Sequence, residues 1–267
     1  MGGFGCEREM NLINEMPTWV CALGLLVLMF VANEIGFRLS RVWNARESER
    51  SHSVSSSLKA TIFGLVALLL GFSFSITSSR FQQRQSLVQD EANAIGTCYL
   101  RSGMLEEPHR GQIRQALRTY VDLRLEHFAK ALNPTEFQRT TAEMNSALDD
   151  LWAGVAAGCL ANHELARVSQ IVPAANEVID LSAKRAWTSQ NHLPPSMLWL
   201  LGVCIVLSAG LTGHSSGQTE HRHVSLWIAL NVLVLLVLYE ILDFDRPRRG
   251  LIQVNHAPLV DVQKSLH

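Results

Sequence analysis

The sequence predicts an all-α membrane protein with four transmembrane helices and a helical-bundle domain inserted between the second and the third. Three observations predict this fold. Apolar residues, 48% of the 267-residue chain, gather in four blocks of membrane-spanning length. About 115 mostly polar residues separate the second block from the third, and their apolar positions recur at helical spacing. Backbone polar groups in hydrocarbon must be satisfied within their own segment, so such blocks indicate spanning helices.

The first apolar block runs from about Trp19 to Phe37 and is interpreted as a retained helix. Glu7, Glu9 and Glu15 precede it, whereas a cleavable signal peptide would begin with basic residues. The other three blocks cover 60–76, 195–211 and 224–242. The predicted organisation is therefore an N-terminal segment (1–18), two membrane helices (19–78), a soluble helical domain (79–194), two further membrane helices (195–243) and a C-terminal tail (244–267).

The soluble segment is predicted to be helical throughout. No Gly or Pro occurs between Gly71 and Gly96, so the second span should continue beyond the membrane as one long helix. Asn133 and Pro134 mark a new helix, because Asn caps free N–H groups and Pro is tolerated in the first turn. Pro173 lies inside the last helical stretch and should kink it.

Basic residues favour one orientation in the cell membrane. The link between spans one and two, with a predicted polar loop over Ser51 to Ser57, carries Arg38, Arg41, Arg46, Arg50 and Lys59. Such an excess is typical of cytoplasmic loops, which places the soluble domain and both termini on the extracytoplasmic side. Basic residues also flank the membrane on that other side, so the opposite orientation stays open.

The soluble domain contains two cysteines, Cys98 and Cys159. In an oxidising compartment they are candidates for a disulfide. The alternative is a pair of buried, reduced thiols.

No catalytic or metal-binding pattern has the context that its chemistry needs. Gly213-His214-Ser215-Ser216-Gly217 matches the nucleophile elbow, but we expect it in a short loop between two membrane helices. His221 and His223 share that loop without a cysteine or carboxylate cluster at ligand spacing. The net charge of −1 offers no excess for nucleic acid. We therefore expect no enzymatic activity, no metal, no cofactor and no nucleic-acid partner.

Small residues recur along span two at every third or fourth position, which is typical of close helix packing. They are Gly64, Ala67, Gly71, Ser75 and Ser78. The alternative is a pore-lining face, where aromatic side chains form an apolar constriction and hydroxyl groups contact ions. The pore-lining candidates are Phe72, Ser73, Phe74, Ser75 and Phe81, with Phe74 and Phe81 preferred because seven residues separate them.

Ionisable residues gather where spans two and four end. Arg80 and Arg84 follow span two, and Glu240, Asp243 and Asp245 close span four. Charges at membrane depth are costly and are usually paired. We therefore expect Arg80 or Arg84 to pair with Glu240 or Asp245 at the membrane interface.

Two motifs carry a family resemblance. Asp90-Glu91-Ala92-Asn93-Ala94-Ile95-Gly96-Thr97 follows span two, and Asp245-Arg246-Pro247 with Gly250-Leu251-Ile252-Gln253-Val254 follows span four. With these motifs the chain resembles bacterial and plastid bestrophin-like proteins of unknown function over nearly its whole length. The motif residues are Glu91, Asn93, Gly96, Thr97, Arg246, Pro247 and Gly250. The resemblance implies kinship to bestrophins, four-span oligomeric anion channels with a phenylalanine-lined neck and a cytosolic soluble domain.

Two functions remain in competition. The first is a homo-oligomeric channel in the lipid bilayer, conducting small anions along span two. The second is a membrane-anchored helical module that senses or binds a partner without catalysis. A membrane enzyme ranks third because its motifs are missing from the sequence.

Overall fold

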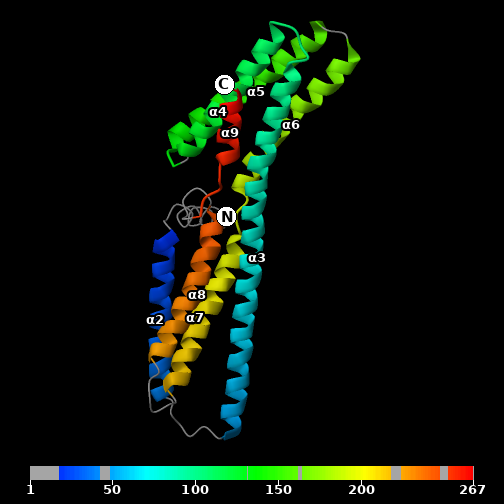
Figure 1. Ribbon diagram of the computed structural model, residues 1–267. Helices are drawn as coiled ribbons and strands as arrows, with labels where there is room; N and C mark the ends of the chain where they lie inside the picture. The colour runs from blue at the N-terminus through cyan, green and yellow to red at the C-terminus, as the bar shows by residue number, and fades with distance from the viewer. Residues whose placement is uncertain are drawn as a thin grey trace, which may run out of the picture. The chain divides into compact units, whose positions relative to one another are not determined.

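The computed structural model describes residues 18–42, 49–130, 132–161, 164–217, 224–246 and 252–266. The regular structure within these ranges is helical, with no strand, as the sequence predicts. Figure 1 labels the helices in chain order: α2 (Thr18–Val42), α3 (Glu49–Ser102), α4 (His109–Ala129), α5 (Pro134–Ala161), α6 (Leu165–Gln190), α7 (Pro195–Gly217), α8 (Val224–Asp245) and α9 (Ala257–Leu266).

The chain divides into two compact units. Unit 1 comprises Met1–Arg80 and His192–Ile252, and unit 2 comprises Phe81–Asn191 and Gln253–His267. Among the described residues, four helical stretches are long and apolar enough to cross a membrane, and they overlap the four predicted blocks. Helix α3 has 54 residues and contributes to both units, which confirms the long continuous helix expected beyond span two.

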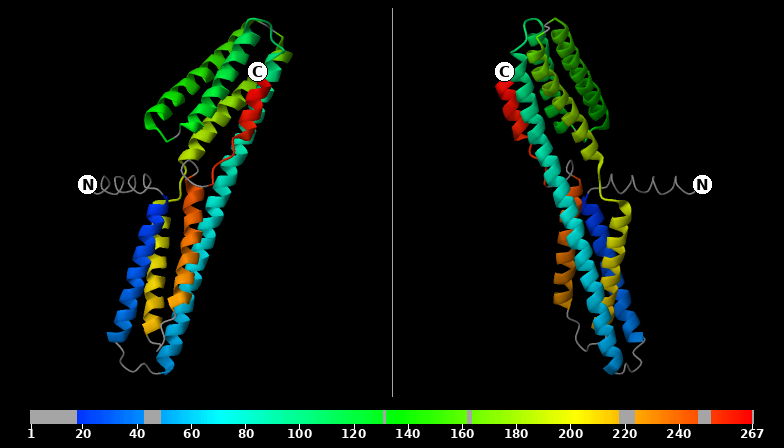
Figure 2. Two further views of the ribbon diagram at one scale, coloured as in Figure 1. Left: turned by 60° about the vertical axis from the view of Figure 1, so that its left-hand side comes forward. Right: turned by 90° about the vertical axis from the view of Figure 1, so that its right-hand side faces the viewer.

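In unit 1, helices α2, α7, α8 and the first part of α3 run side by side (Figures 1 and 2). Buried side chains from all four helices form their common core, among them Met29, Leu70, Leu201 and Ile241. Helices α2 and α7 come closest. A Cβ atom on Gly213 would lie 2.0 Å from the backbone oxygen of Asn33, so only glycine permits this approach.

Two sequence expectations about loops were wrong. The Gly213 to Gly217 motif is the last turn of α7, because its glycines form the contact with α2 rather than a turn. The Ser51 to Ser57 stretch is helical and belongs to the start of α3. That stretch contains neither Gly nor Pro, so nothing in its sequence interrupts the helix.

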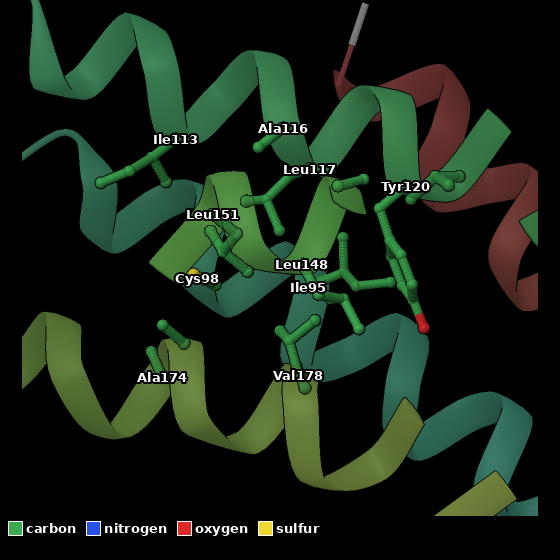
Figure 3. Packing of buried hydrophobic residues seen from close by; sticks show 14 of the residues in the cluster. Ile95, Cys98, Ile113, Ala116, Leu117, Tyr120, Leu148, Leu151, Ala174 and Val178 are labelled. Atoms are coloured by element: carbon green, nitrogen blue, oxygen red, sulfur yellow. The ribbon is translucent and has the colours of Figure 1, made fainter. Parts of the chain in front are cut away.

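In unit 2, α4, α5, α6, α9 and the second part of α3 surround one apolar core. Figure 3 shows its centre, where Ile95 of α3, Leu117 of α4, Leu151 of α5 and Val178 of α6 point toward one another. Asn133 caps α5 as predicted, its Oδ1 accepting a hydrogen bond from the backbone N–H of Thr135 at 3.1 Å. Helix α9 was not predicted from the sequence.

Candidate functional site

The first part of α3 presents a stripe of small residues that no other part of unit 1 covers, as far as the structure describes it. Gly64, Ala67, Gly71 and Ser75 are all exposed. A Cβ atom added to Gly64 or Gly71 would meet nothing within 4 Å. Within the described residues, these small residues therefore do not serve packing against other helices, unlike Gly213 on α7.

A row of large apolar side chains lies beside the small-residue stripe. Leu68, Phe72 and Ile76 follow one another at intervals of four residues and are 53%, 57% and 38% exposed. Residues four apart lie on nearly the same side of a helix. We call this set, with the small-residue stripe, the open face of α3.

The structure separates the predicted pore-lining residues. Phe72 and Ser75 lie on the open face. Ser73 is only 1% exposed and its hydroxyl donates to the backbone oxygen of Leu69 at 2.8 Å, so it points into the bundle. Phe74 is 41% exposed and its ring lies 5.9 Å from that of Phe244.

Phe81, which the sequence pairs with Phe74, belongs to unit 2 and packs against that unit's core. Of the three aromatic candidates, Phe72 alone lies on the open face, whereas Phe74 contacts Phe244 and Phe81 packs in unit 2.

The charged residues at the ends of spans two and four have well-defined partners. The Oδ1 atom of Asp245 accepts a hydrogen bond from the backbone N–H of Leu193 at 2.9 Å, and the Oδ2 atom of Asp243 accepts one from Ile252 at 2.8 Å. These carboxylates thus tie the C-terminal end of α8 to the segment before α7 and to the segment that follows α8.

The basic partners predicted for these carboxylates also have contacts of their own. Arg84 donates to the backbone oxygens of Thr188 and Asn191, at 3.4 and 2.7 Å. Arg80 is half-buried, Glu240 is half-buried, and their pairing stays a prediction.

Unit 2 contains a fully buried carboxylate, Glu91, whose exposed fraction is 0%. The hydroxyl group of Tyr120 donates to its Oε1 atom, and the Arg185 guanidinium donates to its Oε2 atom. The Nη2 atom of Arg124 lies 3.0 Å from Oε1. Three side chains from α4 and α6 thus converge on one carboxylate from α3.

The charges around Glu91 set its protonation and that of Tyr120. Burial alone raises the pKa of Glu91, but Arg124, Arg185 and the Tyr120 hydroxyl hold its pKa below the ordinary value. Burial raises the pKa of Tyr120. The cluster therefore holds one carboxylate, a neutral phenol and two guanidinium groups, which leaves one excess positive charge.

The C-terminal segment, residues 253–266, docks on unit 2 beside this cluster. Gln85 and Asn255 form a reciprocal pair, the Gln85 Nε2 donating to the Asn255 oxygen at 3.1 Å and the Asn255 N–H donating to the Gln85 Oε1 at 2.8 Å. Leu259 is fully buried. At the far end, Arg118 donates to the backbone oxygen of Leu266 at 2.7 Å.

Glu91 belongs to a family motif in the sequence, but its partners were not predicted. A signal was present for Arg124, which follows Ile113, Leu117 and Tyr120 on one apolar stripe. A charged residue on an apolar stripe is usually buried with a partner. No such signal in the sequence identifies Arg185 as a second partner of Glu91.

The other motif residues lie in different surroundings. Asn93 and Thr97 are exposed, Gly96 is half-buried and Arg246 is buried. Pro247 and Gly250 lie outside the described residues.

Cys98 and Cys159 are both free thiols in the structure, so the candidate disulfide is not formed there. Burial raises the pKa of the Cys98 thiol to about 12, which keeps it protonated and unreactive. In the described part of the chain, no three His, Cys, Asp or Glu side chains gather at metal-binding distance.

Among the described residues, four apolar helical stretches of spanning length, together with a second unit that has its own core, define a multi-pass helical membrane protein. The bestrophin-like domain matches residues 26–259, and the chain belongs to the bestrophin-like family, as its two motifs indicate. No curated protein matches it.

Crystal structures share the fold. A bacterial bestrophin homologue from Klebsiella pneumoniae carrying a point mutation is 14% identical, with a TM-score of 0.68 over 92% of this chain and 96% of that chain. A membrane protein of 14% identity has a TM-score of 0.65 over 92% and 96%. The structure of the Klebsiella homologue phased with zinc is 14% identical, with a TM-score of 0.65 over 92% of this chain and 95% of that chain. Identities this low establish the fold alone.

Proposed function

We propose that this protein is a homo-oligomeric anion channel of the cell membrane, with the open face of α3 turned toward the axis of the oligomer. The observation that carries the proposal is the open face itself. It exposes small and large apolar residues side by side on a helix whose other side is packed into unit 1. A second copy of the chain is the simplest occupant of the small-residue stripe, because such stripes let helices approach closely.

The apolar row suits the neck of a pore. Leu68, Phe72 and Ile76 would form successive rings around the axis, and apolar rings exclude ions that cannot shed water. No charged residue occurs between Lys59 and Arg80, so no fixed charge would trap an ion there. Small anions such as chloride are less strongly hydrated than small cations, which favours their passage.

Unit 2 would then be the domain outside the bilayer, inserted in the chain between the second and third spans. The charge of the first link favours an extracytoplasmic position, whereas kinship to bestrophins favours the cytosol. Reporters inserted near Gln138 and fused after the C-terminal residue should respond on the same side of the membrane. Reporters on opposite sides would contradict the four-span arrangement.

The test of the proposed function is chloride flux through the purified protein reconstituted in liposomes. Wild-type protein should conduct above empty liposomes, and Phe72→Ala should raise the flux several-fold because it widens the neck. Leu233→Ala is the matched control, because Leu233 on α8 is equally exposed (60%) but lies off α3. Its flux should equal that of wild type.

The same test needs the oligomeric state of the purified protein, which is obtained from its mass in detergent. A monomer without flux in either the wild type or the Phe72 variant would contradict the channel. The membrane-anchored helical module that binds a partner would then be the better account.

A further inference from the structure

The side chain of His256 occupies a position where both ring nitrogens have fixed roles. The Nδ1 atom lies 2.7 Å from the backbone oxygen of Val254, which can only accept, so Nδ1 carries the proton. The Nε2 atom lies 3.4 Å from the Nη2 atom of Arg185, which can only donate. Nε2 must therefore be unprotonated, and the docked imidazole is neutral.

The surroundings of His256 oppose a positive charge on its ring. Helix α4 contributes Arg124 and the Phe128 ring, whose centroid is 3.6 Å from the imidazole in a stacked arrangement. Helix α6 contributes Arg185, and α3 contributes Glu91. Glu91 already neutralises one of the two guanidinium groups, so a protonated imidazole would add a second unbalanced charge.

We infer that the C-terminal segment is a proton-sensitive latch, which docks on unit 2 while His256 is neutral and is released when His256 gains a proton. A proton on Nε2 would point at the Arg185 guanidinium, replacing a hydrogen bond with a repulsion. His256 can therefore be protonated without this repulsion only when the C-terminal segment has left its docked position. This inference concerns unit 2 and holds whether or not the protein conducts ions.

Release would be visible along the whole segment, because α9 depends on docking for its helical structure. It has 10 residues. Isolated helices shorter than about 12 residues are marginal in water. Its buried residues, Leu259 and Leu266, face unit 2, and its last carbonyl is held by Arg118 and Tyr99. Undocking would therefore expose the α9 backbone amides to solvent.

The direction of the pH effect follows from linkage. Burial, with Arg185 and Arg124, lowers the pKa of docked His256 from 6.5 to about 4, against the opposing effects of Val254 and Glu91. A group whose pKa is lowered by docking favours docking fully above its free pKa. That contribution is lost as the pH falls from 6.5 toward 4. Between about pH 7.5 and about pH 5, docking should weaken roughly 30-fold.

Hydrogen–deuterium exchange on the full-length protein in detergent tests the latch. The protection of the α9 amides, corrected for the intrinsic pH dependence of exchange, should fall roughly 30-fold from about pH 7.5 to about pH 5. The α5 amides serve as an internal control and should keep their protection. His256→Gln cannot be protonated but can still accept from Arg185 through its amide oxygen, so its α9 protection should not change with pH.

Two further variants keep the test decisive. Gln85→Ala removes the pair with Asn255 and should lower α9 protection at every pH while preserving the same fall. His256→Phe keeps an aromatic ring against Phe128 and should again show no fall. If α9 is undocked in both His256 variants even at neutral pH, the test rests on the wild-type protein. A fall in its α9 amide protection below about pH 6.5 then supports the latch.

Two results would overturn the inference. One is wild-type α9 protection that stays constant between about pH 7.5 and about pH 5. The other is an equal fall in His256→Gln or His256→Phe, which would assign the titration to another group.

Discussion

The two parts of α3 bury polar groups in different ways. In unit 1, the buried hydroxyls of Ser73 and Thr77 donate to carbonyls one turn earlier on the same helix, at 2.8 and 2.9 Å. In unit 2, the buried carboxylate of Glu91 takes its donors from residues 29, 33 and 94 positions away. A hydroxyl can be satisfied locally in apolar surroundings, whereas a buried charge needs other helices.

This difference predicts that a change at Glu91 should have the largest effect. Glu91→Gln would leave two buried guanidinium groups without a counter-charge and should lower the free energy of unfolding by about 3–5 kcal/mol. Thermal unfolding in detergent measures the loss. Glu143→Gln is the control, because Glu143 pairs with Arg139 on the surface and should contribute at most about 1 kcal/mol. Equal losses in the two variants would contradict a structural role for the cluster.

A second prediction sharpens the contrast within unit 1, where close backbone contact replaces charge pairing. Gly213→Ala places a Cβ atom 2.0 Å from the Asn33 oxygen, so α2 and α7 must separate. We expect the free energy of unfolding to fall by about 1–3 kcal/mol. Gly71→Ala, with nothing within 4 Å, should be neutral or stabilising by up to about 1 kcal/mol through helix propensity.

The Gly71 position also separates folding from assembly. Gly71→Leu should leave unit 1 folded, since the added side chain has open space there, but should reduce the mass of the oligomer in detergent. An oligomer of unchanged mass would show that the small-residue stripe is not a contact between copies.

The smallest effect is expected at Thr77. Thr77→Ala removes a hydroxyl whose acceptor carbonyls already belong to the helix, so no buried group loses its partner. The unfolding free energy should change by less than about 1 kcal/mol. A loss as large as that of Glu91→Gln would remove the distinction between the two parts of α3.

The same contrast explains what the sequence could predict. Apolar blocks, helical stripes and the Asn133 cap depend on neighbours within a few residues, and the structure confirms them. The partners of Glu91, and the return of the C-terminal segment to Gln85, join residues far apart in the chain. The spacing of residues along the sequence does not predict contacts of this kind. The Gly213 motif was misinterpreted because its role depends on the approach of α2.

The open face was predicted in part for the same reason. Helical spacing groups Gly64, Gly71 and Ser75 correctly, but it cannot tell which face the rest of the bundle covers. The contacts of α3 place Ser73 inward and leave Phe72 exposed.

Cysteine labelling of the open face tests the central claim most directly. Ile76 belongs to the apolar row and not to the small-residue stripe, so chloride flux should fall to a small fraction of its starting value when Ile76→Cys protein in liposomes reacts with a charged methanethiosulfonate reagent. Wild-type protein treated with the same reagent measures any effect of the native thiols, and Leu233→Cys should keep its flux because Leu233 lies on α8 and not on α3. Full labelling of Ile76→Cys without loss of flux, or an equal loss in Leu233→Cys, would contradict a pore lined by α3.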